Sequence, residues 1–175
     1  MKMEDRVFGK LIFTQEAIKS RVRELGHKIT ADYHGKNLFM IGVLKGAYAF
    51  FADLSRAVSL PLQVDFLVVS SRRIISDLTQ DIAGHDVLIV EDIIDSGDTG
   101  AFLKKELLAR SPQSLRLCSL LDKPHRRKTN IDIDYIGFTI PDKFVVGYGL
   151  NYKNRYRNLP YISVLDKVQN DEAFA

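Results

Sequence analysis

The sequence has few features of a secreted, disulfide-stabilised or membrane-spanning protein. Its one cysteine, Cys118, cannot form an internal disulfide and lies in the strand-like segment SLRLCSLL, where we expect a small buried apolar residue. No apolar run reaches the roughly 20 residues that a transmembrane helix needs. The segment MKMEDRVFGKLIF lacks the long apolar stretch of a secretory signal. We therefore expect a cytoplasmic protein with no membrane partner.

Net charge is also low. The formal value of +3 is too small to require a nucleic-acid partner, although basic residues gather in the segment HRRK, residues 125–128, which we expect to form a solvated loop. The content of 46% hydrophobic and 27% charged residues is ordinary for a globular protein. We expect one domain over residues 1–175, because this length supports a single substantial core.

Helix-like and strand-like segments alternate along the chain. Thr14 is a suitable cap for a helix that runs to about Tyr33, with Gly35 after its end. The other predicted helices are residues 46–58 and 99–110, and the predicted strands are residues 38–43, 62–70, 86–91 and 114–121, followed by the short pieces DYIGFTI, FVVGY and YISVL. This alternation predicts an α/β fold, with a mostly parallel twisted sheet flanked by helices on both faces.

The segment DVLIVEDIIDSGDTG, residues 86–100, joins a buried strand to a turn of the kind that holds phosphate. Ligands of open parallel sheets bind beyond the carboxyl ends of the strands, so this turn is the expected site. Ser96, Gly97 and Thr99 offer hydroxyl and backbone N–H groups at the start of a helix, whose dipole favours phosphate. The segment contains neither the P-loop pattern nor the G-x-G-x-x-G dinucleotide pattern.

Four carboxylates crowd the same turn, from Glu91, Asp92, Asp95 and Asp98. They could bind a divalent cation that carries phosphate, hydrogen-bond sugar hydroxyls, or stabilise positive charge that develops in a reaction. Mg²⁺ suits one or two carboxylates plus substrate oxygens. Adjacent Glu91 and Asp92 point to opposite faces of an extended strand, so they need not share one task. A sugar phosphate with a diol and a Mg²⁺-bound leaving group would use all three of these interactions.

This segment resembles the signature of type I phosphoribosyltransferases, and most of all the hypoxanthine (or hypoxanthine-guanine) phosphoribosyltransferase family. Three further segments agree in order. IGVLKGAYAFFADL is similar to the pyrophosphate-binding turn, LCSLLDKP to the purine-selecting lysine region, and IPDKFVVGYGLNYKNRYRNLPYI to the C-terminal purine hood. The resemblance extends from the first helix to about Leu165. It implies the type I phosphoribosyltransferase fold, with a small hood from the N- and C-terminal segments, and a homodimer or homotetramer.

The family transfers ribose 5-phosphate from phosphoribosyl pyrophosphate to hypoxanthine, and often guanine, and releases pyrophosphate. The resemblance therefore implies a purine-salvage glycosyltransferase of the pentosyl-transfer type that makes IMP or GMP with Mg²⁺ as cofactor. It also implies that Asp95 is the general base near purine N7, since a carboxylate there can accept a proton or pair with an N7–H. Lys123 would donate to the 6-oxo group and so select against the 6-amino group of adenine.

Positions that match the family motifs give the implied binding residues. The implied phosphoribosyl and 5′-phosphate residues are Glu91, Asp92, Asp95, Ser96, Gly97, Asp98 and Thr99; those for pyrophosphate are Leu44, Lys45, Gly46, Lys143 and Arg157; those for purine are Lys123, Phe144 and Val145; those for metal are Glu91, Asp92 and Asn151. The bond between Leu44 and Lys45 is often cis in this family. Strand context alone would instead place Phe144 in the core, and Lys143 and Arg157 as solvated charges.

The sequence departs from the family pattern at two places. The family has an extended loop with a Ser-Tyr motif that closes over the reacting centre, whereas here Ser70 and Ser71 run directly into RRIISDLTQDIAGHD. Without that loop, we expect incomplete water exclusion and low turnover. Asn151 stands where the family usually has Asp. It keeps a carbonyl oxygen but loses a charge, which predicts weaker Mg²⁺ binding.

Two other classes share part of the pattern. A phosphoribosyltransferase-like regulator would sense nucleotides and bind nucleic acid through Arg126, Arg127 and Lys128. The missing loop and Asn151 fit such a regulator, but a sensor needs no purine-selecting Lys123. A phosphoacceptor receiver domain also places paired acids at a strand end, but it leaves the DSGDTG turn and the aromatic C-terminal hood unexplained.

Overall fold

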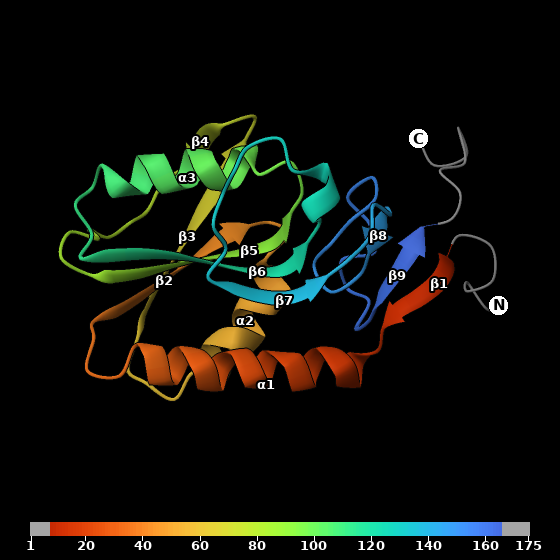
Figure 1. The fold of residues 1–175 in the computed structure, drawn as a ribbon, viewed down its shortest axis with the longest axis horizontal. Helices are drawn as coiled ribbons and strands as arrows, with labels where there is room; N and C mark the ends of the chain where they lie inside the picture. Colours follow the sequence, from red (N-terminus) through yellow and green to blue (C-terminus); the bar gives the residue numbers. More distant parts are fainter. Residues whose placement is uncertain (1–7, 166–175) are drawn as a thin grey trace.

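A six-stranded sheet forms the centre of the protein in the computed structural model, which describes residues 8–165 (Figure 1). Its strands are β2 (Leu38–Leu44), β3 (Gln63–Ser70), β4 (Arg73–Ser76), β5 (Asp86–Ile94), β6 (Ser114–Asp122) and β7 (Tyr135–Thr139). They lie in the order β4-β3-β2-β5-β6-β7, and only the β3–β4 pair is antiparallel. The predicted mostly parallel α/β sheet is confirmed. The prediction of one domain over residues 1–175 includes termini outside the described residues and stays a prediction.

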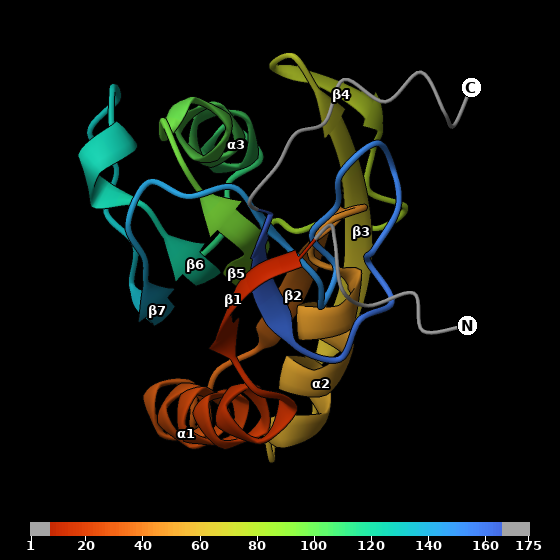
Figure 2. The same cartoon turned by 90° about the vertical axis from the view of Figure 1, so that its right-hand side faces the viewer.

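Helices cover both faces of this sheet, as Figure 2 shows: α1 (Gln15–Asp32) and α2 (Tyr48–Ala57) lie on one side, and α3 (Asp98–Leu108) lies on the other. The burial pattern follows strand alternation, since Met40 packs with the α1 and α2 core whereas Phe39 packs with the α3 core. Helix α1 begins as expected, because the Thr14 hydroxyl accepts a hydrogen bond from Ala17 N at 3.2 Å.

A second, three-stranded antiparallel sheet forms the hood, in the order β1-β9-β8. Its strands are β1 (Phe8–Phe13), β8 (Val145–Val146) and β9 (Ile162–Leu165). The two ends of the described chain therefore lie side by side (Figure 1), with Leu11 opposite Ser163. The Ser163 hydroxyl donates to a backbone carbonyl of β1, with Gly9 O and Lys10 O each 3.3 Å away. This confirms the hood of N- and C-terminal segments that the family resemblance implied.

The β3–β4 connection is a tight hairpin. Ser70 pairs with Arg73, so Ser71 and Arg72 alone form the turn, with φ of 47° and 58°. Positive φ at both central residues is the geometry of a type I′ turn, which suits the twist of paired strands. Within the described residues, the chain therefore has no extended loop at this point.

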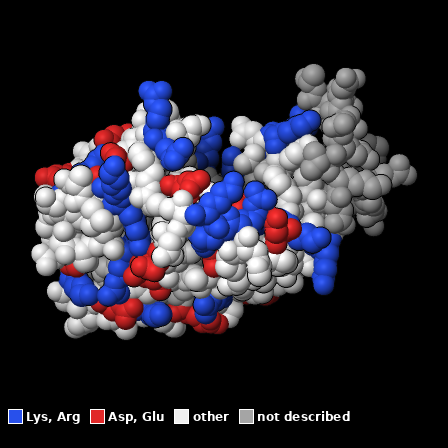
Figure 3. Space-filling model, turned by 45° about the horizontal axis from the view of Figure 1, so that its top comes forward, with Lys and Arg blue, Asp and Glu red and all other residues white. Residues whose placement is uncertain are grey.

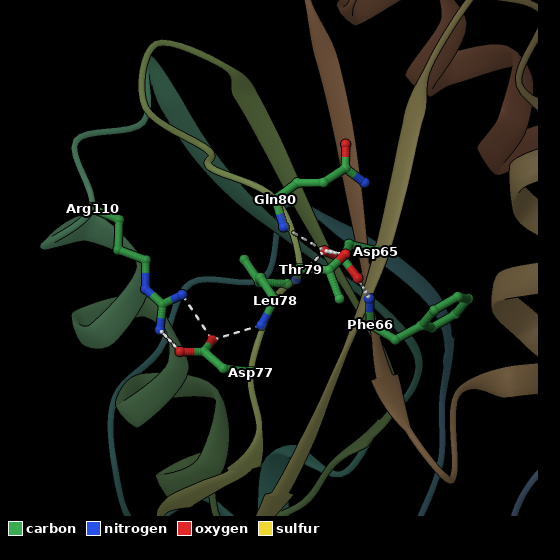
Figure 4. A network of polar contacts seen from close by, with 7 residues as sticks. All are labelled: Asp65, Phe66, Asp77, Leu78, Thr79, Gln80 and Arg110. Atoms are coloured by element: carbon green, nitrogen blue, oxygen red, sulfur yellow. Dashed lines mark hydrogen bonds and ion pairs between the residues drawn. The ribbon is translucent and has the colours of Figure 1, made fainter.

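The segment after β4 is fixed to the sheet by a buried carboxylate (Figure 4). Asp65 accepts hydrogen bonds from the backbone N–H groups of Thr79 and Gln80 at 2.7 and 3.2 Å, and from the Thr79 hydroxyl at 3.0 Å. A few residues earlier, Asp77 pairs with Arg110 just beyond α3 at 2.8 Å. These contacts attach the segment after β4, residues 77–80, both to β3 and to the end of α3.

Two expectations from composition can be compared with the structure. Cys118 is completely buried, as expected, and burial raises the pKa of its thiol well above the usual range. Among the helices of residues 8–165, none is both long enough and apolar enough to cross a membrane.

Candidate active site

The turn between β5 and α3 has the geometry of an anion site. Gly97 caps α3 with φ of 88°, and a Cβ atom there would lie 2.6 Å from Thr129 O, so this position requires glycine. The Ser96 carbonyl accepts hydrogen bonds from the backbone N–H groups of Lys128 and Thr129 at 2.9 and 3.0 Å. Residues 128 and 129 thus hold the turn in place. The first N–H of α3, that of Asp98, donates to the Ser96 hydroxyl at 3.3 Å, and the start of this helix is where an anion would bind.

Asp98 occupies the first position of α3. Hydrogen bonds from Thr129 and Ser96, helped by the charges of Arg72 and Lys128, hold the pKa of the Asp98 carboxyl below its usual range. The negative charge also suits the positive end of the helix dipole. Arg72 at the tip of the β3–β4 hairpin is therefore part of the electrostatic surroundings of this turn, which sequence reasoning did not predict.

Glu91 and Asp92 lie at the end of β5, with Glu91 buried and Asp92 half-buried. Desolvation, followed by repulsion from Asp92, raises the pKa of Glu91 well above its usual range. Desolvation also raises the pKa of Asp92 to about 6, although the charge of Arg157 opposes that shift. The Glu91 Oε1 atom is buried and has no hydrogen-bond partner among the described residues. An unpaired buried carboxylate is costly, so this arrangement favours either the protonated form or a bound cation.

Two backbone turns close around Asp92. The Leu44–Lys45 bond is cis, as the resemblance implied, and Gly46 follows it directly. A Cβ atom at Gly46 would lie 1.8 Å from Asp92 Oδ2, and one at Gly149 would lie 2.1 Å from Gly46 O. The carboxylate, the turn after β2 and the hood loop are therefore in direct contact, and only glycine fits at both positions.

Arg157 belongs to this group. Its guanidinium donates to Gly149 O at 2.6 Å, which holds it beside the glycine turn, and its buried Nε has no partner among the described residues. Arg157 is thus not the simply solvated charge expected from the sequence alone. Lys143 is exposed, and Asn151 is half-buried two residues after Gly149. For Lys143 and Asn151, the described part of the chain shows no side-chain hydrogen bond that would test their predicted roles.

A second group of side chains lies at the ends of β5 and β6. Lys123 is only 6% exposed, and its Nζ lies 3.7 Å from Asp95 Oδ2. Phe144 is 48% exposed and meets the ring of Tyr152 edge-on at 5.8 Å, so the strand-based expectation of a core aromatic was wrong. Val145 beside it is buried. An exposed ring and a buried lysine suit a planar, polar ligand better than they suit a hydrophobic core.

The basic segment after β6 is largely exposed, as we expected, but it is more ordered than a simple loop. It begins with the short 3₁₀ helix η1 (Pro124–Arg126). Arg126 Nε donates to Asp95 Oδ1 at 2.7 Å, and Arg127 pairs with Asp122 and donates to Asp95 O at 3.3 Å. The sequence did not predict the ion pair of Arg126, because the carboxylate of Asp95 is 31 positions away. On the face shown in Figure 3, basic and acidic side chains lie side by side.

The residues present fit a magnesium ion. Within residues 8–165, no group of three or more His, Cys, Asp or Glu side chains could hold a metal by itself. Mg²⁺, however, usually takes one or two carboxylates and completes its coordination with water and substrate oxygens. The pair Glu91 and Asp92, with an unpartnered buried oxygen, supplies such a partial ligand set.

A mostly parallel sheet with a glycine-capped turn before α3, a carboxylate pair and a hood is the arrangement expected of a phosphoribosyltransferase. Consistent with this class, residues 10–153 match the family model of the phosphoribosyl transferase domain. The chain belongs to this family, among the hypoxanthine (and hypoxanthine-guanine) phosphoribosyltransferases, as its relatives show.

The relatives agree in sequence and in fold. Hypoxanthine phosphoribosyltransferase of Escherichia coli K12 is 47% identical over 165 residues, covering 87% of this chain and 93% of the relative. Hypoxanthine-guanine phosphoribosyltransferase of Mycobacterium tuberculosis is 48% identical over 172 residues, covering 89% and 85%. The crystal structure of a Staphylococcus aureus hypoxanthine phosphoribosyltransferase is similar with a TM-score of 0.89 at 41% identity, covering 94% and 96%.

These relatives confirm the predicted class, a purine-salvage glycosyltransferase of the pentosyl-transfer type. They give no support to the regulator that binds nucleic acid. In addition, the charges of Arg126 and Arg127 are each paired with a carboxylate of this chain.

Proposed function

We propose that this enzyme transfers the 5-phosphoribosyl group from phosphoribosyl pyrophosphate to hypoxanthine, and also to guanine, forming IMP or GMP and pyrophosphate. The observation that carries the proposal is that two groups of polar side chains, which we call half-sites, meet at the end of β5. One half-site contains the buried Glu91 and the half-buried Asp92 beside the turn before α3, and the other contains the buried Lys123 next to Asp95.

The first half-site would bind the sugar. The phosphate turn, Ser96 to Thr99, would hold the 5′-phosphate through hydroxyl groups and the N-terminal N–H groups of α3. Glu91 and Asp92 would contact the ribose diol, directly or through Mg²⁺, and Asn151 would offer a carbonyl oxygen to the same ion. When bound, Mg²⁺ would neutralise charge on the pyrophosphate leaving group.

The pyrophosphate side would be formed by backbone and cations. The turn Leu44–Gly46 would present N–H groups, and Gly46 allows the close approach to Asp92 that brings this turn to the site. Arg157 lies beside the turn, and its charge already acts on Asp92. Lys143 would add a second positive charge from the hood.

The second half-site would bind the purine. Phe144 would stack on the ring, the Val145 backbone would meet its edge, and Lys123 would donate to the 6-oxo group. Asp95 would manage the proton at N7 while N9 attacks the sugar carbon and the bond to pyrophosphate breaks. Because positive charge develops on the sugar ring, the neighbouring carboxylates would also stabilise the transition state.

An assay of the purified protein with phosphoribosyl pyrophosphate, Mg²⁺ and hypoxanthine tests this proposal, with adenine as the control base. We expect IMP from hypoxanthine and almost no product from adenine. In Asp95→Asn, loss of a general base should lower kcat by about 100-fold, while affinity for IMP is largely retained. No IMP from the wild type would refute the activity, and equal losses of turnover and IMP affinity would refute the base role of Asp95.

We also propose that the enzyme is a homodimer or a homotetramer. The edge formed by β3 and β4 exposes large apolar side chains, with Val64, Phe66 and Ile75 at 41%, 38% and 63% exposure. Apolar side chains grouped at a sheet edge are a common feature of subunit interfaces.

A further inference from the structure

Asp95 is held by the basic turn that follows β6. Arg126 Nε donates to its Oδ1 at 2.7 Å, Arg127 Nη1 donates to its backbone carbonyl at 3.3 Å, and Lys123 Nζ lies 3.7 Å from its Oδ2. The backbone N–H of Lys123 also donates to Ile94 O at 3.0 Å. One short segment therefore contacts both oxygens of the carboxylate and the backbone on either side of it.

Arg126 extends this contact to the hood. Its Nη1 lies 3.4 Å from Asp142 Oδ2, in the loop that leads to Phe144. The guanidinium thus links the turn after β5 to the loop before Phe144, and both segments belong to the proposed purine half-site. Because a guanidinium is planar and its donors are fixed relative to one another, it can set the position of both carboxylates at once.

We propose that Arg126 is a positioning residue for Asp95. By binding Oδ1, it holds the carboxylate plane so that Oδ2 points to Lys123 and the incoming purine. Its second contact, with Asp142, fixes the loop before Phe144 relative to that carboxylate. This inference rests on the proposed function, because it assigns a task to Arg126 only if Asp95 manages the purine proton.

Stability alone gives a poor account of these contacts. The side chain of Arg126 is 50% exposed, and those of Asp95 and Asp142 are 39% and 54% exposed. Exposed ion pairs contribute little to folding stability. A small change in the placement of a reacting group, in contrast, can cost up to about 100-fold in rate. Loss of Arg126 should therefore affect kcat far more than the free energy of unfolding.

A kinetic double-mutant cycle with Asp95 tests the proposal. We expect Arg126→Gln to lower kcat about tenfold and Arg126→Lys to lower it less, since lysine keeps one charged donor. In the Asp95→Asn background, the same Arg126→Gln change should have almost no further effect, because Arg126 acts through the Asp95 carboxylate. Lys105→Gln removes an exposed charge from the last turn of α3 and is the matched control.

Additive losses in the two backgrounds, or full activity of Arg126→Gln, would overturn the proposal. A second readout does not depend on turnover. Crystal structures of the ligand-free wild type and Arg126→Gln should show the Asp95 carboxylate rotated or disordered only in the variant, and an unchanged carboxylate would also overturn it. An inactive wild type would refute the proposed function, whereas an active wild type with an insensitive Arg126 would refute only this inference.

Discussion

Two neighbouring carboxylates are taken out of water at the end of β5, and neither is fully compensated by the protein. Glu91 has a buried oxygen without a partner, and Asp92 has a pKa of about 6 because desolvation outweighs the attraction of Arg157. Such a pair is stable when neutral or when a cation is bound. This pair should therefore lower the free energy of unfolding of the ligand-free enzyme, in exchange for a site that is ready to bind a charged sugar and a metal.

The first residue-scale prediction concerns pH and stability. The usual pKa of an aspartate is about 3.9 and that of folded Asp92 is about 6, so between these values the folded state holds a proton that the unfolded state has released. The free energy of unfolding should therefore fall as pH rises through this window. At pH 7.5, Asp92→Asn should be more stable than the wild type by roughly 2 kcal/mol.

Urea unfolding in EDTA at pH 4.5 and 7.5 measures this difference. The free energies of unfolding of the wild type and Asp92→Asn should converge at the lower pH, where Asp92 is already protonated in the folded state. Asp132→Asn is the control, because Asp132 is exposed. Equal pH dependence in the wild type and Asp92→Asn would contradict the desolvation of this carboxylate.

The sequence predicts the acids of the site better than it predicts their partners. Glu91, Asp92 and Asp95 follow directly from a buried strand that ends in a Ser-Gly turn. The contacts of Arg126 were not predicted, because its partners Asp95 and Asp142 are 31 and 16 positions away. Such contacts depend on which strands are neighbours in the sheet, and hydrophobic periodicity does not determine that order.

At the scale of elements, the central strands and helices were predictable because their periodicity is strong. Strand β2 and helix α1 lie within about a residue of their predicted bounds. The last two strand-like segments were also recognised, but alternation alone would have added them to the parallel sheet. They pair instead with each other, and β9 also pairs with β1, in a hood that only the family resemblance implied. Pairing between the two ends of a chain is a long-range property that a local pattern does not encode.

The β3–β4 hairpin leads to a prediction about turnover. Its turn consists of Ser71 and Arg72, and Asp65 holds the segment that follows it, so this element is too short and too well anchored to close over the sugar. Water should therefore reach the reacting carbon. We expect kcat near or below the low end of enzyme values, about 1 s⁻¹, and some hydrolysis of phosphoribosyl pyrophosphate.

The measurement is the ratio of pyrophosphate released to IMP formed in the same reaction. A ratio above unity is expected, and it should rise as the concentration of hypoxanthine is lowered. Asp95→Asn is a useful comparison, because loss of the base should slow IMP formation more than hydrolysis. Strict equality of the two products at high turnover would show that another element excludes water.

At the scale of the whole molecule, the layers leave one edge of the sheet uncovered. Helix α2 packs against β3 through Phe51 and Phe66, whose ring centroids are 4.9 Å apart, yet Phe66 remains 38% exposed. Ile74 packs into the α3 core, so Ile75 points to the opposite face by strand alternation, and it is 63% exposed. The face of β3 and β4 on the α2 side is thus apolar and lacks a cover within the described residues.

A second copy of the chain is the cover that we expect. Light scattering coupled to size exclusion should give at least twice the chain mass of 19.9 kDa for the wild type, and about the single-chain mass for Ile75→Lys, because a charge would be buried in the interface. Leu108→Lys introduces the same charge on α3, where the apolar side chain of Leu108 is 57% exposed, and it should leave the mass unchanged.

Association at this face should also affect the pyrophosphate-binding residues. Tyr48 at the start of α2 donates to Arg157 O at 3.2 Å, so a subunit packed against α2 should stabilise the position of Arg157. A monomeric Ile75→Lys should therefore show a raised KM for phosphoribosyl pyrophosphate. A wild type that stays monomeric at micromolar concentration would contradict the predicted homo-oligomer.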